Sequence, residues 1–185
     1  HTETVSWGEV VKFIDDPVLR DQADTYHRDR VGAPPYGLNG DLGLRYQDVG
    51  GRIPHQSGIR ETVDDTSVHR DVTLSRRAMD SFQLDYMVLF PTPMLFLGMH
   101  PQPYMEVVLC NAYNRWLTEE ILPGDPKLKA MVVIPFNTPE EACKTVERFG
   151  KCPGVIGFTV TSTRYKPVHS NEYMRLYRMI EETGK

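Results

Sequence analysis

The chain has 185 residues, of which 40% are hydrophobic and 25% are charged, with a formal net charge of −4 and a pI near 5.9. This length is sufficient for one domain with a hydrophobic core, and we expect a single domain over residues 1–185. The acidic balance, without any basic cluster, excludes the charge pattern of a nucleic-acid-binding protein. No apolar run approaches the roughly 20 residues that span a bilayer, so we expect no membrane partner.

The number and spacing of the cysteines indicate whether the cellular compartment of the protein is reducing or oxidising. Cys110, Cys143 and Cys152 form neither a C-x-x-C pair nor an even framework of disulfides. Buried or unreacted thiols of this kind are typical of a reducing compartment, which predicts a cytoplasmic protein.

The first 70 residues divide into two parts. Residues 1–20 contain a short apolar pattern at helical spacing, which Pro17 interrupts. From about residue 21 to residue 70, glycines and prolines break every period, so we expect a long irregular insertion. It is either a flexible stretch or an excursion packed over a site. Its apolar residues favour the second alternative, and they are Tyr26, Tyr36, Leu38, Leu42, Leu44 and Tyr46.

Beyond residue 70, helical and extended patterns alternate. The apolar run at 86–90 ends at Pro91-Thr92-Pro93, which predicts a strand buried on both faces. Two more strands are predicted at 130–134 and 155–160. Predicted helices precede, separate and follow the strands, at about 73–82, 102–121, 138–149 and 171–182.

The helix at 138–149 carries the clearest terminal pattern. Thr138, Pro139 and Glu141 predict a capping box with proline at the first helical position. Gly150 lies where a left-handed residue commonly ends a helix. The α-β-α-β-α-β-α order predicts βαβ units and a parallel sheet, and by itself it fits a barrel and an open sheet equally well.

Three motifs then point to a family. R-R-A-M-D at 76–80, D-Y-M-V-L-F-P-T-P at 85–93 and N-A-Y-N-R-W-L at 111–117 occur in this order. Together they resemble the amidohydrolase-2 branch of the amidohydrolase superfamily, which includes enzymes similar to aminocarboxymuconate-semialdehyde decarboxylase. The resemblance covers about residues 70–183, and the first 20 residues show a weaker similarity.

The resemblance implies a fold, a metal and a reaction. The fold is an α/β (β/α)8 TIM barrel, and the metal is a divalent ion, usually zinc and sometimes manganese. Such enzymes hydrolyse cyclic esters and amides, or remove a carboxylate from a small acid. His1-Thr2-Glu3 falls where the family has its H-x-H motif, so His1 and Glu3 are the predicted metal ligands. The other ligands of the family end later strands.

A family barrel needs roughly 250 residues. We therefore expect a partial barrel, the N-terminal half, with the irregular insertion after its first strand. Three explanations stay open: a truncated chain, one subunit of a split enzyme, or a degenerate relative. Two ligands are too few for a tight metal site.

Other residues are candidates for substrate binding. Ligands of such sheets bind beyond the carboxyl ends of the strands, which draws attention to Thr92 and His100 after the first predicted strand. Arg164, after the third, would contact an acidic substrate. Asn114 and Trp116 are expected to pack in the interior. The remaining histidines show no metal-binding spacing and receive no role; they are His27, His55, His69 and His169.

The sequence thus predicts a metal-dependent hydrolase or decarboxylase that acts on a small cyclic or carboxylated substrate. A non-catalytic subunit that needs a complementary chain is the alternative from another class. A homo-oligomer is also expected. A third hypothesis is an open α/β sheet that binds a small ligand; the sequence has no phosphate-binding loop for a nucleotide.

Overall fold

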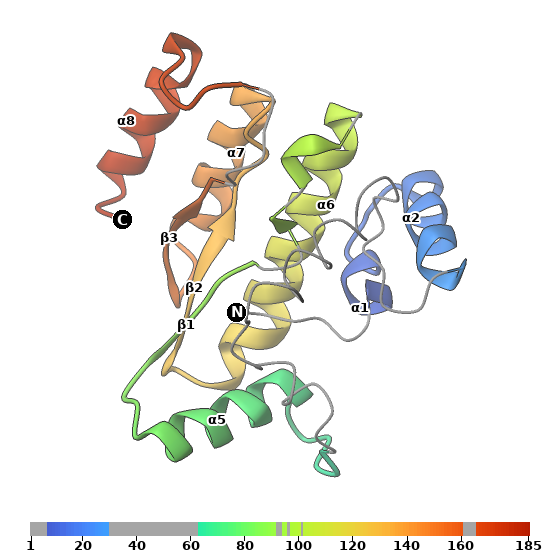
Figure 1. Cartoon of the computed structure of the whole chain (residues 1–185), viewed down its shortest axis with the longest axis vertical. Helices are drawn as coiled ribbons and strands as arrows, with labels where there is room; N and C mark the ends of the chain where they lie inside the picture. The colour runs from blue at the N-terminus through green and yellow to red at the C-terminus, as the bar shows by residue number, and fades with distance from the viewer. Residues whose placement is uncertain (1–6, 30–62, 92–93, 96, 101, 161–165) are drawn as a thin grey trace, which may run out of the picture.

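The computed structural model describes residues 7–29, 63–91, 94–95, 97–100, 102–160 and 166–185. These residues form a three-stranded parallel sheet in the order β1-β2-β3, as Figure 1 shows. The strands are β1 (Met87–Leu89), β2 (Leu128–Val133) and β3 (Val155–Thr159). Two helices connect them, α6 (Pro103–Trp116) and α7 (Pro139–Phe149). The predicted alternation of helices and strands is therefore confirmed, and the chain is a small α/β domain.

The prediction of a partial (β/α)8 barrel is wrong. A barrel requires more strands than the three that the described residues contain. The error has a physical origin, because βαβ units give the same sequence pattern whether the sheet closes or stays open.

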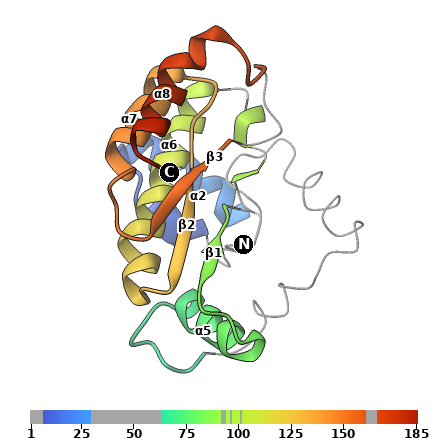
Figure 2. The same cartoon turned by 90° about the vertical axis from the view of Figure 1, so that its left-hand side faces the viewer.

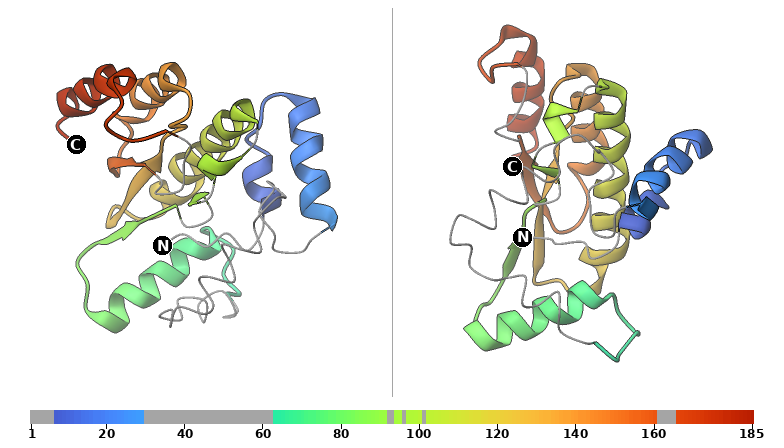
Figure 3. Two further views of the ribbon diagram at one scale, coloured as in Figure 1. Left: turned by 45° about the horizontal axis from the view of Figure 1, so that its top comes forward. Right: turned by 45° about the vertical axis from the view of Figure 1, so that its right-hand side comes forward.

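Helices outside the βαβ units complete the layers. In Figures 2 and 3, α6 and α7 cover one face of the sheet. Helices α1 (Trp7–Val11) and α2 (Pro17–Asp29) lie on the far side of α6, and α8 (Met174–Glu182) packs on α7. Helix α5 (Arg70–Phe82) leads into β1 at the amino edge of the sheet. The irregular insertion was predicted to begin near residue 21, but α2 continues to Asp29; residues 30–62 lie outside the described residues.

Helix α6 is central because it is buried toward both the sheet and the α1–α2 pair. Its apolar side chains join one large core cluster with β1, β2 and α1. The buried apolar residues of α6 are Met105, Leu109, Cys110, Ala112, Tyr113 and Trp116. A second cluster lies under α7 and α8, where the rings of Phe136 and Tyr173 stack at 3.9 Å.

A hydrogen-bond pair joins α6 to β2. Asn114, which is fully buried, donates from Nδ2 to the carbonyl oxygen of Val133 at 2.8 Å. Its Oδ1 accepts from the Val133 N–H at 3.0 Å. The predicted packing of Asn114 and Trp116 in the interior is confirmed. Asn114 also forms hydrogen bonds with both the N–H and the carbonyl oxygen of Val133.

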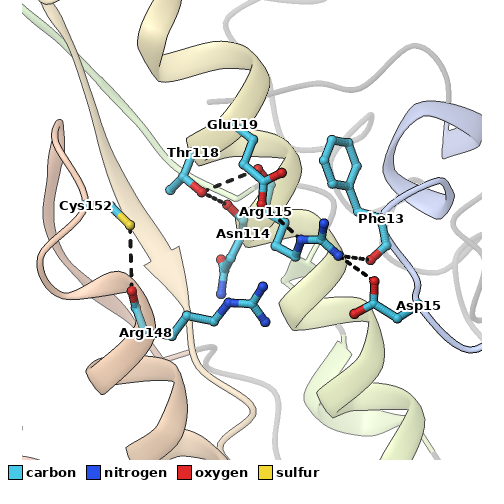
Figure 4. Close-up of polar contacts among 8 residues, drawn as sticks. All are labelled: Phe13, Asp15, Asn114, Arg115, Thr118, Glu119, Arg148 and Cys152. Carbon is cyan, nitrogen blue, oxygen red and sulfur yellow. Dashed lines mark hydrogen bonds and ion pairs between the residues drawn. The ribbon is translucent and has the colours of Figure 1, made fainter.

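Arg115, the next residue, holds α1 against α6. Its Nη1 donates to the Phe13 carbonyl at 3.0 Å and to Asp15 Oδ1 at 2.8 Å, and its Nε donates to Glu119 at 3.0 Å (Figure 4). The guanidinium also lies 5.3 Å from the centre of the Phe13 ring. Neighbouring residues of α6 thus face opposite layers, Asn114 the sheet and Arg115 the α1–α2 pair.

At the amino edge, Arg76 fixes α5 to the segment that leads into β2. Its Nε donates to Asp125 Oδ2 at 2.7 Å and its Nη2 donates to the Gly124 carbonyl at 2.6 Å. Only glycine fits at 124, since a Cβ there would lie 2.7 Å from a methyl group of Val72.

The helix predicted over 102–121 does not keep one geometry. Helix α6 ends at Trp116 and continues as η3 (Leu117–Ile121), a π-helical turn in which the Leu122 N–H reaches the Leu117 carbonyl. Leu117 and Ile121 stay buried, while Glu119 and Glu120 are exposed.

Helix α7 has the predicted limits but not the predicted caps. The Thr138 side chain makes no capping bond, and Glu141 pairs with Lys144 at 2.6 Å instead of reaching back. Gly150 is right-handed, with φ of −60°, so the left-handed prediction is wrong. Glycine is needed there for a different reason, because a Cβ would lie 2.6 Å from the Val146 carbonyl.

The prediction that the strand at 86–90 is buried on both faces is also wrong. Leu89 is 2% exposed, but Tyr86 is 63% exposed and Phe90 is 44% exposed. The residues on either side of β1 therefore keep large apolar side chains partly exposed.

We expect the Asn114→Leu variant to unfold more easily than the wild type. The free energy of unfolding should fall by about 3 kcal/mol, because two buried peptide groups lose partners at about 1–3 kcal/mol each. Urea unfolding followed by circular dichroism measures this change. Asn111→Leu, the same change at a half-buried position of α6, is the control and should stay within about 1 kcal/mol of the wild type. Equal effects of the two substitutions would contradict the importance of the Asn114–Val133 bonds.

Candidate functional site

The carboxyl ends of the three strands share one edge of the sheet, and the described residues that follow β1 and β2 lie there (Figure 1). Ligands of parallel α/β sheets bind at this edge. After β1 comes the 3-10 turn η2 (Leu97–Met99), and after β2 comes the loop 134–138 that leads into α7. The amino end of α6 lies at the same edge, because α6 runs antiparallel to the strands.

Glu106 is the central polar residue of this edge. It lies in the first turn of α6 and is only 2% exposed. Its Oε2 accepts a hydrogen bond from the Asn137 N–H at 3.3 Å, and Asn137 Nδ2 donates to the Gly98 carbonyl at 2.7 Å. Glu106 and Asn137 thus join three segments, namely η2, α6 and the loop after β2. We call this set, Glu106 with Asn137 and Gly98, the carboxyl-edge cluster.

Burial sets the proton affinity of Glu106. Removal from water raises the pKa of its carboxyl to about 7, although hydrogen bonds from Asn137 and Phe136 lower it in part. Near neutral pH this side chain is therefore present in both the neutral and the ionised form. Carboxyls with a pKa raised in this way are more frequent at functional sites than elsewhere in proteins.

Cys110 follows Glu106 by one turn of α6. It is completely buried, and burial together with the nearby Glu106 carboxyl raises the pKa of its thiol well above the ordinary value. The thiol is therefore protonated at neutral pH and does not act as a nucleophile.

His100, the one predicted substrate contact that the structure describes, lies between η2 and α6. It is half-buried, and burial lowers the pKa of its ring, so the ring is neutral at pH 7. Its Nδ1 lies 3.1 Å from the backbone nitrogen of Gln102 and 3.2 Å from the Gln102 carbonyl oxygen. Nδ1 accepts from the first group or donates to the second, depending on which ring nitrogen carries the proton.

Two buried oxygen atoms at the carboxyl edge also bear on the site. Asn137 Oδ1 and Thr159 Oγ1, the latter at the end of β3, have no hydrogen-bond partner among the described residues. Buried polar atoms are nearly always paired in folded proteins. This edge therefore has hydrogen-bonding capacity that its described neighbours do not use.

The other predicted site residues are not tested by this geometry. His1, Glu3, Thr92 and Arg164 lie outside the described residues. In the part of the chain that the structure describes, no three His, Cys, Asp or Glu side chains gather as a metal-binding group requires.

Sequence analysis missed Glu106 and Asn137. A sign was present for Glu106, because it is the one carboxylate among the buried residues Met105, Leu109 and Cys110 of α6. A charged residue inside an apolar helical stripe is worth noting, since it is seldom fully buried without a partner. No comparable sign marks Asn137, which follows a strand as many turn residues do.

Comparison of the chain with protein-family models and with curated proteins finds no match. Among the described residues, no helix combines the length and apolar content that crossing a membrane requires.

We expect Glu106→Gln to stabilise the protein in a pH-dependent manner. The folded state binds this proton more tightly than the unfolded state, whose carboxyl titrates near 4.5. Wild-type stability should therefore be highest below that value and should fall as the pH rises to about 7. The glutamine variant lacks this loss. The difference in free energy of unfolding between the variant and the wild type should therefore grow by about 2–3 kcal/mol between about pH 5 and 8.

Urea unfolding at the two pH values measures the effect. Glu147→Gln, at an exposed position of α7, is the control and should show no such growth. An advantage of Glu106→Gln that does not change with pH would mean that the carboxyl is ionised at both values.

Proposed function

We propose that the protein is a metal-dependent hydrolase or decarboxylase that acts on a small cyclic or carboxylated substrate, in the manner of the amidohydrolase-2 branch. The observation that carries this proposal is Glu106, a buried carboxyl whose pKa is near 7 at the carboxyl edge of a parallel sheet. The three motifs that resemble the family support it from the sequence.

Residues at the same edge would bind the substrate. The neutral His100 ring carries one N–H, which is a suitable donor to a carbonyl or carboxylate oxygen of a substrate. Thr92 and Arg164 follow β1 and β3 in the sequence, and the guanidinium of Arg164 suits a substrate carboxylate. Glu106 is too deeply buried to touch the substrate, so we infer that it positions the η2 segment and the loop after β2 through Asn137.

The metal proposed is zinc or manganese, with His1 and Glu3 among its ligands. An imidazole and a carboxylate are suitable donors for either ion. A bound ion would supply a Lewis acid at the carboxyl edge. The described residues offer no further group of ligands, so this part of the proposal rests on His1, Glu3 and the family resemblance.

Metal content and activity test the proposal together. Because His1 and Glu3 alone are too few ligands for a tight site, the test needs protein that also contains the family's remaining ligands, from the same chain or from a complementary one. Such protein, purified without chelators, should contain about one zinc or manganese ion per site. It should also release carbon dioxide from a small aromatic acid or open a lactone, and the product formed distinguishes the two reactions. His1→Ala combined with Glu3→Ala should weaken metal binding by about 100-fold or more, since outer-shell changes alone cost 10–100-fold.

His169→Ala, at an exposed histidine, is the matched control and should retain metal and activity. Metal-free protein, or metal content that is unchanged in the double variant, would overturn the proposed site.

A second candidate function is a non-catalytic subunit that supports a partner chain or a second copy of itself. The observation that favours it is the exposure of several large apolar side chains at the end of α5, on both sides of β1 and in β3. These are Phe82, Leu84, Tyr86, Phe90 and Ile156.

This second function predicts that the purified protein elutes as an oligomer or together with a complementary polypeptide. Tyr86→Ser combined with Phe90→Ser should then release a monomer in size-exclusion chromatography. Val18→Ser, at an exposed apolar position of α2, is the control. A wild-type protein that is monomeric and active alone would exclude this function.

We also infer a cytoplasmic location. Its support is chemical: Cys110, Cys143 and Cys152 are free thiols in the structure, as a reducing compartment would keep them.

A further inference from the structure

His69 uses both of its ring nitrogens, and each binds a different helix. Nε2 lies 2.7 Å from Glu9 Oε2 on α1. Nδ1 accepts the Asp71 N–H at 3.1 Å, and by this bond His69 caps the amino end of α5. The ring also meets Trp116 of α6 edge-on, with 5.7 Å between the ring centres. His69 thus lies where α1, α5 and α6 meet.

The two hydrogen bonds respond differently to protonation of the ring. A nitrogen that accepts a hydrogen bond cannot carry a proton, so the cap on α5 requires Nδ1 to be bare. In the neutral ring the single proton is then on Nε2, which donates it to Glu9. Protonation adds a proton to Nδ1, so the ring can no longer accept the Asp71 N–H. The same event converts the Glu9 bond into an ion pair between charged groups.

The charges around His69 favour the protonated form of its ring. The hydrogen bond to Glu9 raises the pKa of His69 above its ordinary 6.5, in spite of partial burial. The same bond lowers the pKa of Glu9, which therefore stays ionised. The other charged groups that act on the pair are Lys12, which follows α1, Asp71 of α5 and Glu120 of η3.

We propose that His69 is a proton-operated switch, which caps α5 when its ring is neutral and clamps α1 to the α5–α6 junction when its ring is charged. Because the pKa of His69 is raised in the folded state, the ion pair contributes fully below the unfolded value. Its contribution is lost as the pH rises through the folded value. The two helices therefore respond to pH in opposite directions: α1 is held more tightly in acid, and the first turn of α5 is held more tightly in base.

Ring-nitrogen NMR and amide hydrogen exchange on the whole protein test the switch. At high pH the ring should be the Nε2–H tautomer. After correction for intrinsic exchange, protection of the Asp71 amide should be about tenfold lower one pH unit below the His69 pKa than one unit above it. The Phe13 and Ile14 amides close the end of α1, and their protection should be higher one pH unit below the His69 pKa than one unit above it.

Three variants complete the test. His69→Asn keeps a side-chain acceptor for the cap but cannot be charged, so both pH responses should disappear while the protein stays folded. Glu9→Gln should abolish the response of α1 and move the response of Asp71 to lower pH. His169→Asn, the same change at an exposed histidine, should leave both responses intact.

An Nδ1–H tautomer at high pH would overturn the proposal, as would Asp71 protection that does not vary with pH. Responses that persist in His69→Asn would also overturn it. These measurements report on ring nitrogens and backbone amides alone, so their outcome is independent of whether the protein binds metal or turns over a substrate.

Discussion

The pair of hydrogen bonds between Asn114 and Val133 determines where the other elements lie. The Ile134 N–H donates to Thr159 on β3, so the peptide groups of the preceding residue, Val133, point to the opposite side of β2. On that side β1 ends at Leu89, which is opposite Ala130, and so it does not reach Val133. Asn114 replaces the missing strand partner, and this fixes the position of α6 along β2.

The carboxyl-edge cluster depends on this position. Glu106 lies eight residues before Asn114, or about 12 Å along the helix, and this distance brings it level with the loop after β2. A different position of α6 would separate Glu106 from Asn137. At the other end of α6, Trp116 contacts His69. A titrating group therefore lies near each end of α6, Glu106 on the helix itself and His69 against Trp116. Both groups favour the folded protein at lower pH, the carboxyl by becoming neutral and the imidazole by pairing with Glu9.

Local sequence patterns predicted the elements well and their joining poorly. The apolar run at 86–90 and the apolar helical pattern at 138–149 are set by residues close together in the chain. The structure has β1 and α7 at these places, as the patterns predicted. Closure of the sheet depends on strands far apart, and so the barrel was predicted wrongly. Gly150 was expected to be left-handed; the close approach of the Val146 carbonyl, which the pattern does not reveal, is what requires glycine. For the candidate site, the pattern drew attention to the carboxyl edge of the sheet and to His100, whose role stays a prediction. It did not indicate Glu106, because the raised pKa of Glu106 comes from burial.

The π-helical turn η3 has a consequence for how the length of this chain can vary. A π turn contains one residue more than the α-helical turn that it replaces, and the extra residue bulges outward where Glu119 and Glu120 meet solvent. Removing one residue there would convert the π turn into an ordinary α-helical turn, so the segment that follows would keep the direction that Arg76 and Asp125 impose. The amino end of α6 would not move either, because Asn114 is anchored to β2 before the turn begins. A one-residue deletion at η3 would therefore leave both edges of the sheet in place.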